Sequence, residues 1–242
     1  MTVRLPVVRR LLVTLIVLAA IVVGLDRGAA YVAGRELASR IQSQEHLASR
    51  PDVSIEGFPF LTQVASGRYG HGSLTARGLS RSGLTVETAH VDLYGVHVPL
   101  GDITGGHVKD VPVDRATGTA RISFAAVAGA IASRTEGLGT LTLSQASGSS
   151  VRVGGKVTVL GSSYSLDGVG DVSLSRGQLR VAIAGSSLAA LPSVISSRLG
   201  SLLTVSLAVP RLPYGIQLTG ATVDSTGIVI AAQGDHLVLG GG

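Results

Sequence analysis

Apolar residues are unevenly distributed along the chain, and the densest run lies near the N-terminus. Leu11–Leu25 (LLVTLIVLAAIVVGL) carries no charge, and Asp26 and Arg27 end it. A membrane-spanning helix needs about 20 apolar residues, whereas the apolar region of a cleavable export signal has about 7–15. The pattern over residues 11–27 therefore predicts either a transmembrane signal-anchor or a signal peptide, and the sequence leaves both open.

The segment before this run is basic. Residues 1–10 contain Arg4, Arg9 and Arg10 and no acidic residue. Positive charge on the N-terminal side of a span favours a cytoplasmic N-terminus. We therefore expect a single-pass protein of the cell membrane with its main domain extracytoplasmic, or a protein released into the periplasm or envelope if residues 1–30 are cleaved.

Residues 28–50 have the pattern of an amphipathic helix. An apolar stripe at helical spacing is formed by Ala30, Ala33, Leu37, Ile41 and, less regularly, Leu47. The Arg50–Pro51 step ends the pattern, because a residue before proline is disfavoured in a helix. The segment either continues out of the membrane and packs on the following domain, or lies on the lipid surface as an interfacial helix.

The stretch Gly57–Tyr69 (GFPFLTQVASGRY) joins this region to the main domain and holds two of the three Phe in the chain. Helical spacing relates three of its apolar residues, Phe60, Leu61 and Val64. Pro59 suits a first helical turn and Gly67 suits a left-handed end, so we predict a short helix over residues 59–66. Its aromatic cluster is either a plug in the core or the mouth of an apolar binding cavity.

The main domain, residues 51–242, reads chiefly as strands with alternating apolar and polar residues. The predicted strands lie in residues 53–55, 72–79, 84–100, 110–121, 138–144, 150–160, 164–174, 178–184, 205–209, 216–218, 222–224, 228–232 and 236–239. Two more helices are predicted, one from Phe124 to about residue 134 and one over residues 191–202. Gly154–Gly155, residues 161–163 and residues 176–177 are predicted hairpin turns.

Composition and charge exclude several classes of function. The chain has no Cys, so it has neither disulfides nor thiolate chemistry. Of the net charge of +5, residues 1–50 carry +4, which leaves the main domain close to neutral. A nucleic-acid-binding domain needs a concentrated basic face with stacking aromatics. We therefore expect no nucleic-acid partner.

The sequence also lacks the patterns that mark common catalytic sites. It contains no H-E-x-x-H, no G-x-S-x-G, no phosphate-binding G-x-x-x-x-G-K and no G-x-G-x-x-G. The six His are dispersed, and zinc needs three or four converging ligands. We predict no catalytic residue, no metal and no cofactor. Arg68 is the charge of most interest, because it could bind a phosphate bidentately or simply face the C-terminal end of the short helix.

Two motifs carry a resemblance to a known family. One is Glu56–Tyr69 (EGFPFLTQVASGRY), followed by Gly95–Leu100 (GVHVPL), and the other is Arg211–Ile230 (RLPYGIQLTGATVDSTGIVI). With the basic and apolar N-terminus, they make the chain similar to the LmeA-type phospholipid-binding family of the actinobacterial cell envelope. The resemblance implies an α+β fold in which a long curved antiparallel β-sheet wraps around amphipathic helices, preceded by an N-terminal membrane helix, as in the tubular lipid-binding proteins.

The resemblance also implies a function, which is non-enzymatic binding of phospholipid at the outer face of the cytoplasmic membrane in support of cell-envelope biogenesis, with transfer of the lipid left open. The candidate lipid-binding residues are Phe58, Phe60, Leu61, Val64, Arg68, Leu212 and Tyr214. Two alternatives remain at this point. One is a membrane-anchored scaffold for envelope glycosyltransferases without a lipid site. The other is a hydrolase or transferase with an unrecognised site.

Overall fold

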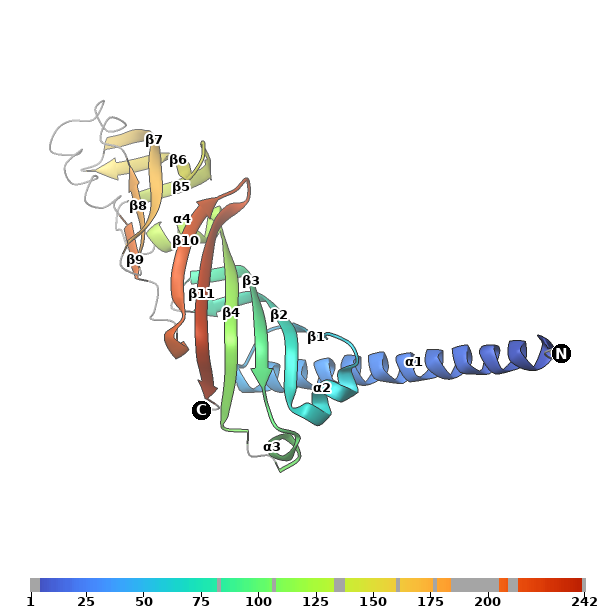
Figure 1. The fold of residues 1–242 in the computed structure, drawn as a ribbon. Coiled ribbons are helices and arrows are strands. Elements are labelled where there is room, and N and C mark those ends of the chain that lie inside the picture. The colour runs from blue at the N-terminus through green and yellow to red at the C-terminus, as the bar shows by residue number, and fades with distance from the viewer. Residues whose placement is uncertain are drawn as a thin grey trace.

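The computed structural model describes residues 5–81, 84–105, 108–132, 138–159, 162–175, 178–183, 205–208 and 213–240. The helix predicted over residues 191–202 and the candidate residue Leu212 lie outside the described residues. Figure 1 shows two antiparallel sheets and one long N-terminal helix that projects from the larger sheet. The predicted α+β class, with a long apolar N-terminal helix followed along the chain by a large antiparallel sheet, is confirmed.

The larger sheet has six strands and combines the first half of the chain with its C-terminal end. Its strands are β1 (Asp52–Glu56), β2 (Arg68–Arg81), β3 (Leu84–His97), β4 (Asp110–Ser123), β10 (Gln217–Val223) and β11 (Gly227–Gly240). Their order across the sheet is β1-β2-β3-β4-β11-β10, and all neighbours are antiparallel. β11 continues through two segments that were predicted as separate strands.

The smaller sheet has five strands in sequential order. They are β5 (Leu138–Gln145), β6 (Ser150–Val159), β7 (Ser162–Ser175), β8 (Gln178–Ile183) and β9 (Val205–Ala208). The prediction of a turn at Gly154–Gly155 is wrong, because both glycines pair with β7 inside β6. This sheet lies at the end of the larger sheet that is remote from the N-terminus (Figure 1), and the side chain of Gln145 donates to the Val223 carbonyl across the junction (3.2 Å).

The helices are α1 (Leu5–Gln44), α2 (Phe60–Ser66), α3 (Leu100–Gly105) and α4 (Phe124–Ala132), with a short 3-10 turn, η2 (Pro213–Gly215). α2 and α4 match predicted helices, whereas α3 was not predicted. α1 joins the apolar run and the amphipathic segment into one continuous helix. It ends before the predicted limit at Arg50, and His46 just beyond it has a left-handed φ of 51°.

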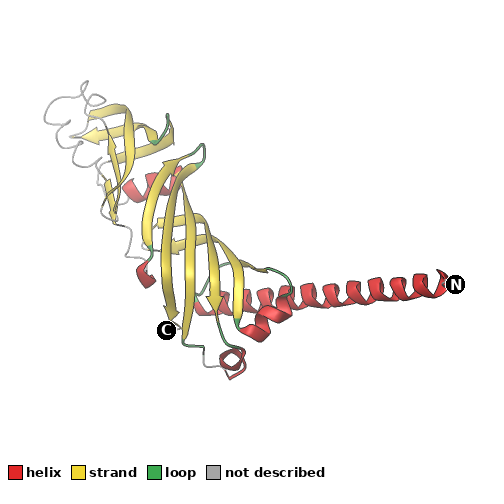
Figure 2. Cartoon of the chain, in the orientation of Figure 1, coloured by secondary structure: helices red, strands yellow, loops and turns green. Residues whose placement is uncertain are grey.

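The two halves of α1 have different surroundings. The first half projects into open space (Figure 2), and the large apolar side chains from Val8 to Leu25 are exposed, for example Leu11 at 70% and Leu15 at 64%. By length and composition this helix can cross a membrane. In the second half, Asp26, Ala30, Gly34 and Ala38 are buried at four-residue spacing, where α1 packs on β1 and α2.

This buried stripe differs from the predicted one. Ala30 is buried as predicted, but Leu37 is 43% exposed and Gly34 takes the buried place instead. A Cβ on Gly34 would lie only 2.8 Å from the carbonyl oxygen of Val53. The helix therefore lies close to the backbone of β1, and the contact leaves room only for small residues.

The faces of the six-stranded sheet follow from its register. One row of paired residues crosses all six strands and is apolar: Val53, Leu74, Val91, Gly118, Ala232 and Leu218. The next row is wholly polar: Ser54, Ser73, Asp92, Thr117, Gln233 and Gln217. Because side chains alternate between faces along a strand, these two sets, here called the apolar row and the polar row, point to opposite sides.

The apolar face is closed at both ends by buried side chains. At the end near α4, the buried residues are Ile122, Phe124, Val127 and Ile228. At the other end, Val113, Ala116 and Leu237 form a core cluster with Leu93 and Val96 packed against it. The apolar row lies between these ends, and each of its six residues is only partly buried.

Candidate functional site

The stretch Gly57–Tyr69, which joins the N-terminal helix to the main domain, forms a compact turn and helix. Pro59 precedes α2 in an extended conformation (φ −76°, ψ 139°) and follows a cis peptide bond from Phe58. Gly67 ends the helix with φ 66° and ψ 20°, which a residue without a Cβ adopts at no steric cost. The sequence prediction for this helix and its glycine stop is confirmed.

A carboxylate from α1 holds the start of α2. The Asp26 side chain is 2% exposed, and its two oxygens accept hydrogen bonds from the backbone N–H groups of Phe60 and Leu61, each at 2.9 Å. The first N–H groups of a helix have no partner within it, so this carboxylate acts as a cap supplied by another helix. A local sequence pattern does not predict this contact, because the partners are 34 and 35 residues apart.

The neighbouring residue, Arg27, completes the connection. Its guanidinium donates to the Asp26 carboxylate at 2.9 Å and to the carbonyl of Gly57, and it lies 5.3 Å from the centre of the Phe58 ring. A cation over an aromatic face is attracted by the negative charge density of the ring. The end of the apolar run and the Gly57–Phe60 turn are therefore linked by charge, hydrogen bonds and an aromatic contact.

The candidate residues of this motif divide between core and surface. Phe60 is 5% exposed and lies 6.4 Å from the ring of Tyr69, and Val64 is partly buried. Phe58 and Leu61 are 60% and 50% exposed. Phe60 therefore fills the core, as in the first of the two predicted roles of this aromatic cluster. Phe58 and Leu61 instead form an apolar surface beside α1.

The remaining candidates lie elsewhere. Arg68 is the exposed first residue of β2, and within the described residues its guanidinium has no ion pair and no side-chain hydrogen bond. Tyr214 is 45% exposed in η2 and donates its hydroxyl to the Gly240 carbonyl at 2.9 Å. η2 adjoins β11, near the sheet edge opposite to β1, so the described contacts do not bring Tyr214 together with α2.

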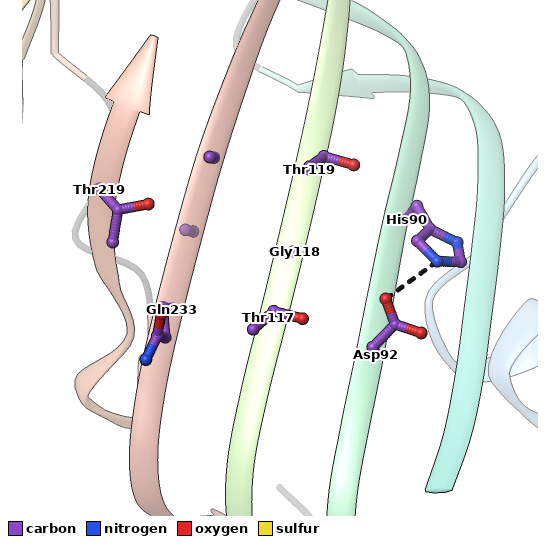
Figure 3. Close-up of a pocket in the computed structure, with 9 residues that line it drawn as sticks. His90, Asp92, Thr117, Gly118, Thr119, Thr219 and Gln233 are labelled. Atoms are coloured by element: carbon purple, nitrogen blue, oxygen red, sulfur yellow. Dashed lines mark ion pairs between the residues drawn. The ribbon is translucent and has the colours of Figure 1, made fainter.

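The polar face has a shallow hollow that the sequence did not predict as a site (Figure 3). Its volume is about 240 Å³, and its lining includes His90, Asp92, Thr117, Thr119, Thr219 and Gln233. Nε2 of His90 lies 3.1 Å from the Asp92 carboxylate. The alternating pattern of residues 84–100 and 110–121 contains these polar positions, but only the register of β3, β4 and β11 shows that they meet.

A second histidine lies beside this hollow. The two ring nitrogens of His71 contact the carboxylates of Asp92 (2.9 Å) and Glu56 (3.0 Å), and the ring stacks on Tyr94 at 4.6 Å. The hydrogen bond to Asp92, aided by that to Glu56, raises the pKa of His71 above its usual value despite some burial. Across the residues that the structure describes, no group of three or more His, Asp or Glu side chains is arranged to hold a metal.

The molecule so described is an α+β protein that couples an apolar helix long enough to cross a membrane to a sheet with one apolar and one polar face. A family model described as LmeA-like phospholipid-binding matches residues 24–233. The chain belongs to this family, as the sequence motifs indicated, and lipid binding is the activity that the family supports. No curated protein and no solved structure matched the chain.

The match begins two residues before Asp26, so it includes the second half of α1. This half packs on β1, and β1 is the edge strand of the larger sheet. Separating the chain at residue 51, the predicted start of the lipid-binding domain, would remove the helix that covers this edge. The experiments proposed below therefore keep the full chain.

Proposed function

We propose that this protein is a non-enzymatic phospholipid-binding protein anchored in the cytoplasmic membrane by the first half of α1. The basic residues before the apolar run favour a cytoplasmic N-terminus, which puts both sheets on the outer side. The bound phospholipid is held against the apolar face of the six-stranded sheet. Carrying it between the membrane and acceptors in the cell envelope is the role we assign to the protein.

The observation that supports this proposal best is the partial exposure of the whole apolar row. An ordinary core would bury Leu74, Val91 and Leu218 completely, yet each keeps exposed surface. Gly118 and Ala232 in the same row leave room above the sheet because their side chains are absent or small. Each buried CH₂ group contributes about 0.8 kcal/mol. One acyl chain along this face would therefore supply most of the binding energy.

The head group needs a polar partner at the end of the sheet, and Arg68, beside Tyr69 at the start of β2, is the residue we propose for it. The guanidinium is exposed, is not engaged by the described residues, and follows α2 directly. A planar guanidinium matches two phosphate oxygens. Phe60 and Tyr69 next to it would border the first carbons of the acyl chains.

A matched pair of variants tests the location of the lipid. A Cβ on Gly118 would lie 3.4 Å from the His90 carbonyl and 3.6 Å from Cγ2 of Val91, so the strand accommodates a side chain there on the apolar face. Gly118→Leu should then fill the space above the apolar row, whereas Thr119→Leu puts the same leucine side chain on the opposite face.

The full chain, purified in mild detergent, is analysed by native mass spectrometry and lipid extraction. We expect one phospholipid per chain in the wild type and in T119L, and at least a tenfold lower occupancy in G118L. Equal occupancy in the two variants would contradict the assignment to the apolar face. A wild type without lipid that also takes up none from vesicles would favour the scaffold function instead.

A further inference from the structure

The junction between α1 and α2 lies where the apolar run of α1 ends, so it bears on which residues the bilayer contacts. The uncharged run Leu11–Leu25 has 15 residues and a length of about 22 Å, whereas the hydrocarbon core of a bilayer is about 30 Å thick. The run alone is thus too short, and the hydrocarbon must extend beyond Leu25 or the bilayer must thin.

The structure removes the obstacle that Asp26 presents in the sequence. Its carboxylate is buried against α2, accepts hydrogen bonds from two N–H groups and pairs with Arg27, so it is not exposed to lipid. Beyond Arg27 the next charged residue is Arg35, and the exposed side chains between them include Tyr31 (63%) and Val32 (65%). The lipid-facing surface of α1 can therefore continue for about two more turns.

α2 presents an apolar surface at this same level. Its N-terminus is fixed to Asp26 by two hydrogen bonds of 2.9 Å, and the exposed apolar residues there are Leu61 in its first turn and Phe58 just before it. The Arg27 guanidinium covers the Phe58 ring, and Arg35 lies 5.5 Å from the Tyr31 ring. Aromatic rings with a neighbouring cation are typical of the membrane interface, where the ring is in the apolar zone and the charge reaches water.

We infer that Phe58 and Leu61 insert into the outer interface of the bilayer that α1 spans, so that the domain is docked on the membrane at α2 rather than suspended from the anchor. The inference rests on the membrane anchoring proposed above. The occupant of this surface is the bilayer itself, because the carboxylate cap ties α2 to the residue that follows the spanning run.

The absence of Trp from the chain provides a clean measurement. Phe58→Trp and Leu61→Trp each create a single fluorescent reporter in the full chain, and Val238→Trp is the control, since Val238 is 52% exposed on β11 and far from α1 in the strand order. The three variants are reconstituted in phosphatidylcholine vesicles, with and without bromine on the acyl chains. Bromine quenches tryptophan on contact.

We expect brominated lipid to lower the emission of F58W and L61W at least about twofold, and to leave V238W almost unchanged, because only the former lie at interface depth. Quenching of F58W and L61W no greater than that of V238W would overturn the inference. So would a return of F58W emission to the control level in the F58W/G118L double variant, since the quencher would then be a bound lipid rather than the bilayer.

The same samples separate this inference from the proposed function. Quenching at residues 58 and 61 in a protein that carries no phospholipid by native mass spectrometry would uphold the docking and reject the lipid site. Lipid bound in a stoichiometric amount without quenching at these residues would uphold the lipid site and reject the docking.

Discussion

The apolar row and the polar row are formed by sequence neighbours, and yet the two faces of the sheet have opposite chemistry. Val91 is followed by Asp92, Thr117 by Gly118, and Ala232 by Gln233. The polar face is joined by ion pairs, including His71–Asp92 and Arg115–Asp235, both at 2.9 Å. The apolar face has buried side chains at its two ends and partly exposed ones in the middle.

This difference is the basis on which we propose the apolar face as the lipid site. The polar side chains find partners among themselves and can also face water at little cost. Exposed apolar side chains in a contiguous row gain free energy only when something apolar covers them. In the proposed function the polar face provides structure and solubility and the apolar face holds the acyl chains, and the following variants test this contrast.

The largest effect is expected at the closed end of the apolar face. Ile228 is 0% exposed and pairs with Ile122. Ile228→Ala should lower the free energy of unfolding by about 2–5 kcal/mol, because it removes apolar contacts and leaves a cavity. Val229→Ala, on the opposite face of the same strand, should cost about 1 kcal/mol. Denaturant unfolding followed by circular dichroism measures both, and equal losses would show that the faces are not distinct.

The next effect concerns the contact of α1 with the sheet edge. Gly34→Ala puts a Cβ 2.8 Å from the Val53 carbonyl and should destabilise the protein by about 1–3 kcal/mol through forced separation of α1 and β1. Gly28→Ala is the control, since a Cβ there meets nothing within 4 Å. It should be neutral or stabilising by up to about 1 kcal/mol through helix propensity. Thermal unfolding in detergent compares them, and a shift of the same sign in both would argue against the close packing.

A pH-dependent effect is expected on the polar face. The carboxylates of Asp92 and Glu56 raise the pKa of His71 in the folded state, so the protonated ring is favoured by folding. The resulting stability is complete below the unfolded pKa of about 6.5 and is lost as the pH rises through the higher folded value. The Tm advantage of the wild type over His71→Gln should thus be larger at pH 5.5 than at pH 8.5, and Asp92→Asn should reduce this pH dependence. An advantage that grows with pH would contradict the assignment.

The smallest effect is expected for an exposed ion pair on the polar face. The Arg77 and Asp52 side chains are 62% and 72% exposed and lie 2.8 Å apart. Exposed pairs of this kind contribute roughly 0–1 kcal/mol, because solvent screens the charges and both side chains lose entropy. Arg77→Ala should change the unfolding free energy by less than about 0.5 kcal/mol. A loss comparable to that of I228A would mean that the polar face carries more of the stability than its exposure implies.

Elements with local chemical causes were predictable from the sequence. α2 follows from the proline before it and the glycine after it, and α4 from its apolar spacing at Phe124, Val127 and Ala128. α3 escaped prediction because six residues are too few for a helical pattern to stand out. A turn was predicted at Gly154–Gly155 because glycine is common in turns and rare in strands. Only the pairing with β7 shows that both residues lie inside β6.

Features that depend on contacts between residues far apart in the sequence could not be predicted from the local pattern of apolar and polar residues. The buried stripe of α1 was predicted to include Leu37, because leucine is more hydrophobic than glycine. Gly34 is buried instead, because α1 approaches the backbone of Val53 closely. The cap by Asp26 joins residues 34 positions apart. Likewise, alternation predicts that Val91 and Asp92 face opposite ways, but only the strand order aligns the apolar row across the sheet.

The assignment of the acyl chains to the apolar face is tested most directly by a phospholipid with a photoreactive acyl chain. The full-length protein in vesicles that contain this lipid is irradiated and digested, and the modified residues are identified by mass spectrometry. We expect labelling at residues of the apolar row, such as Leu74, Val91 and Ala232, and competition by unlabelled phospholipid. Labelling confined to the polar row, or labelling that excess lipid does not reduce, would contradict the central claim.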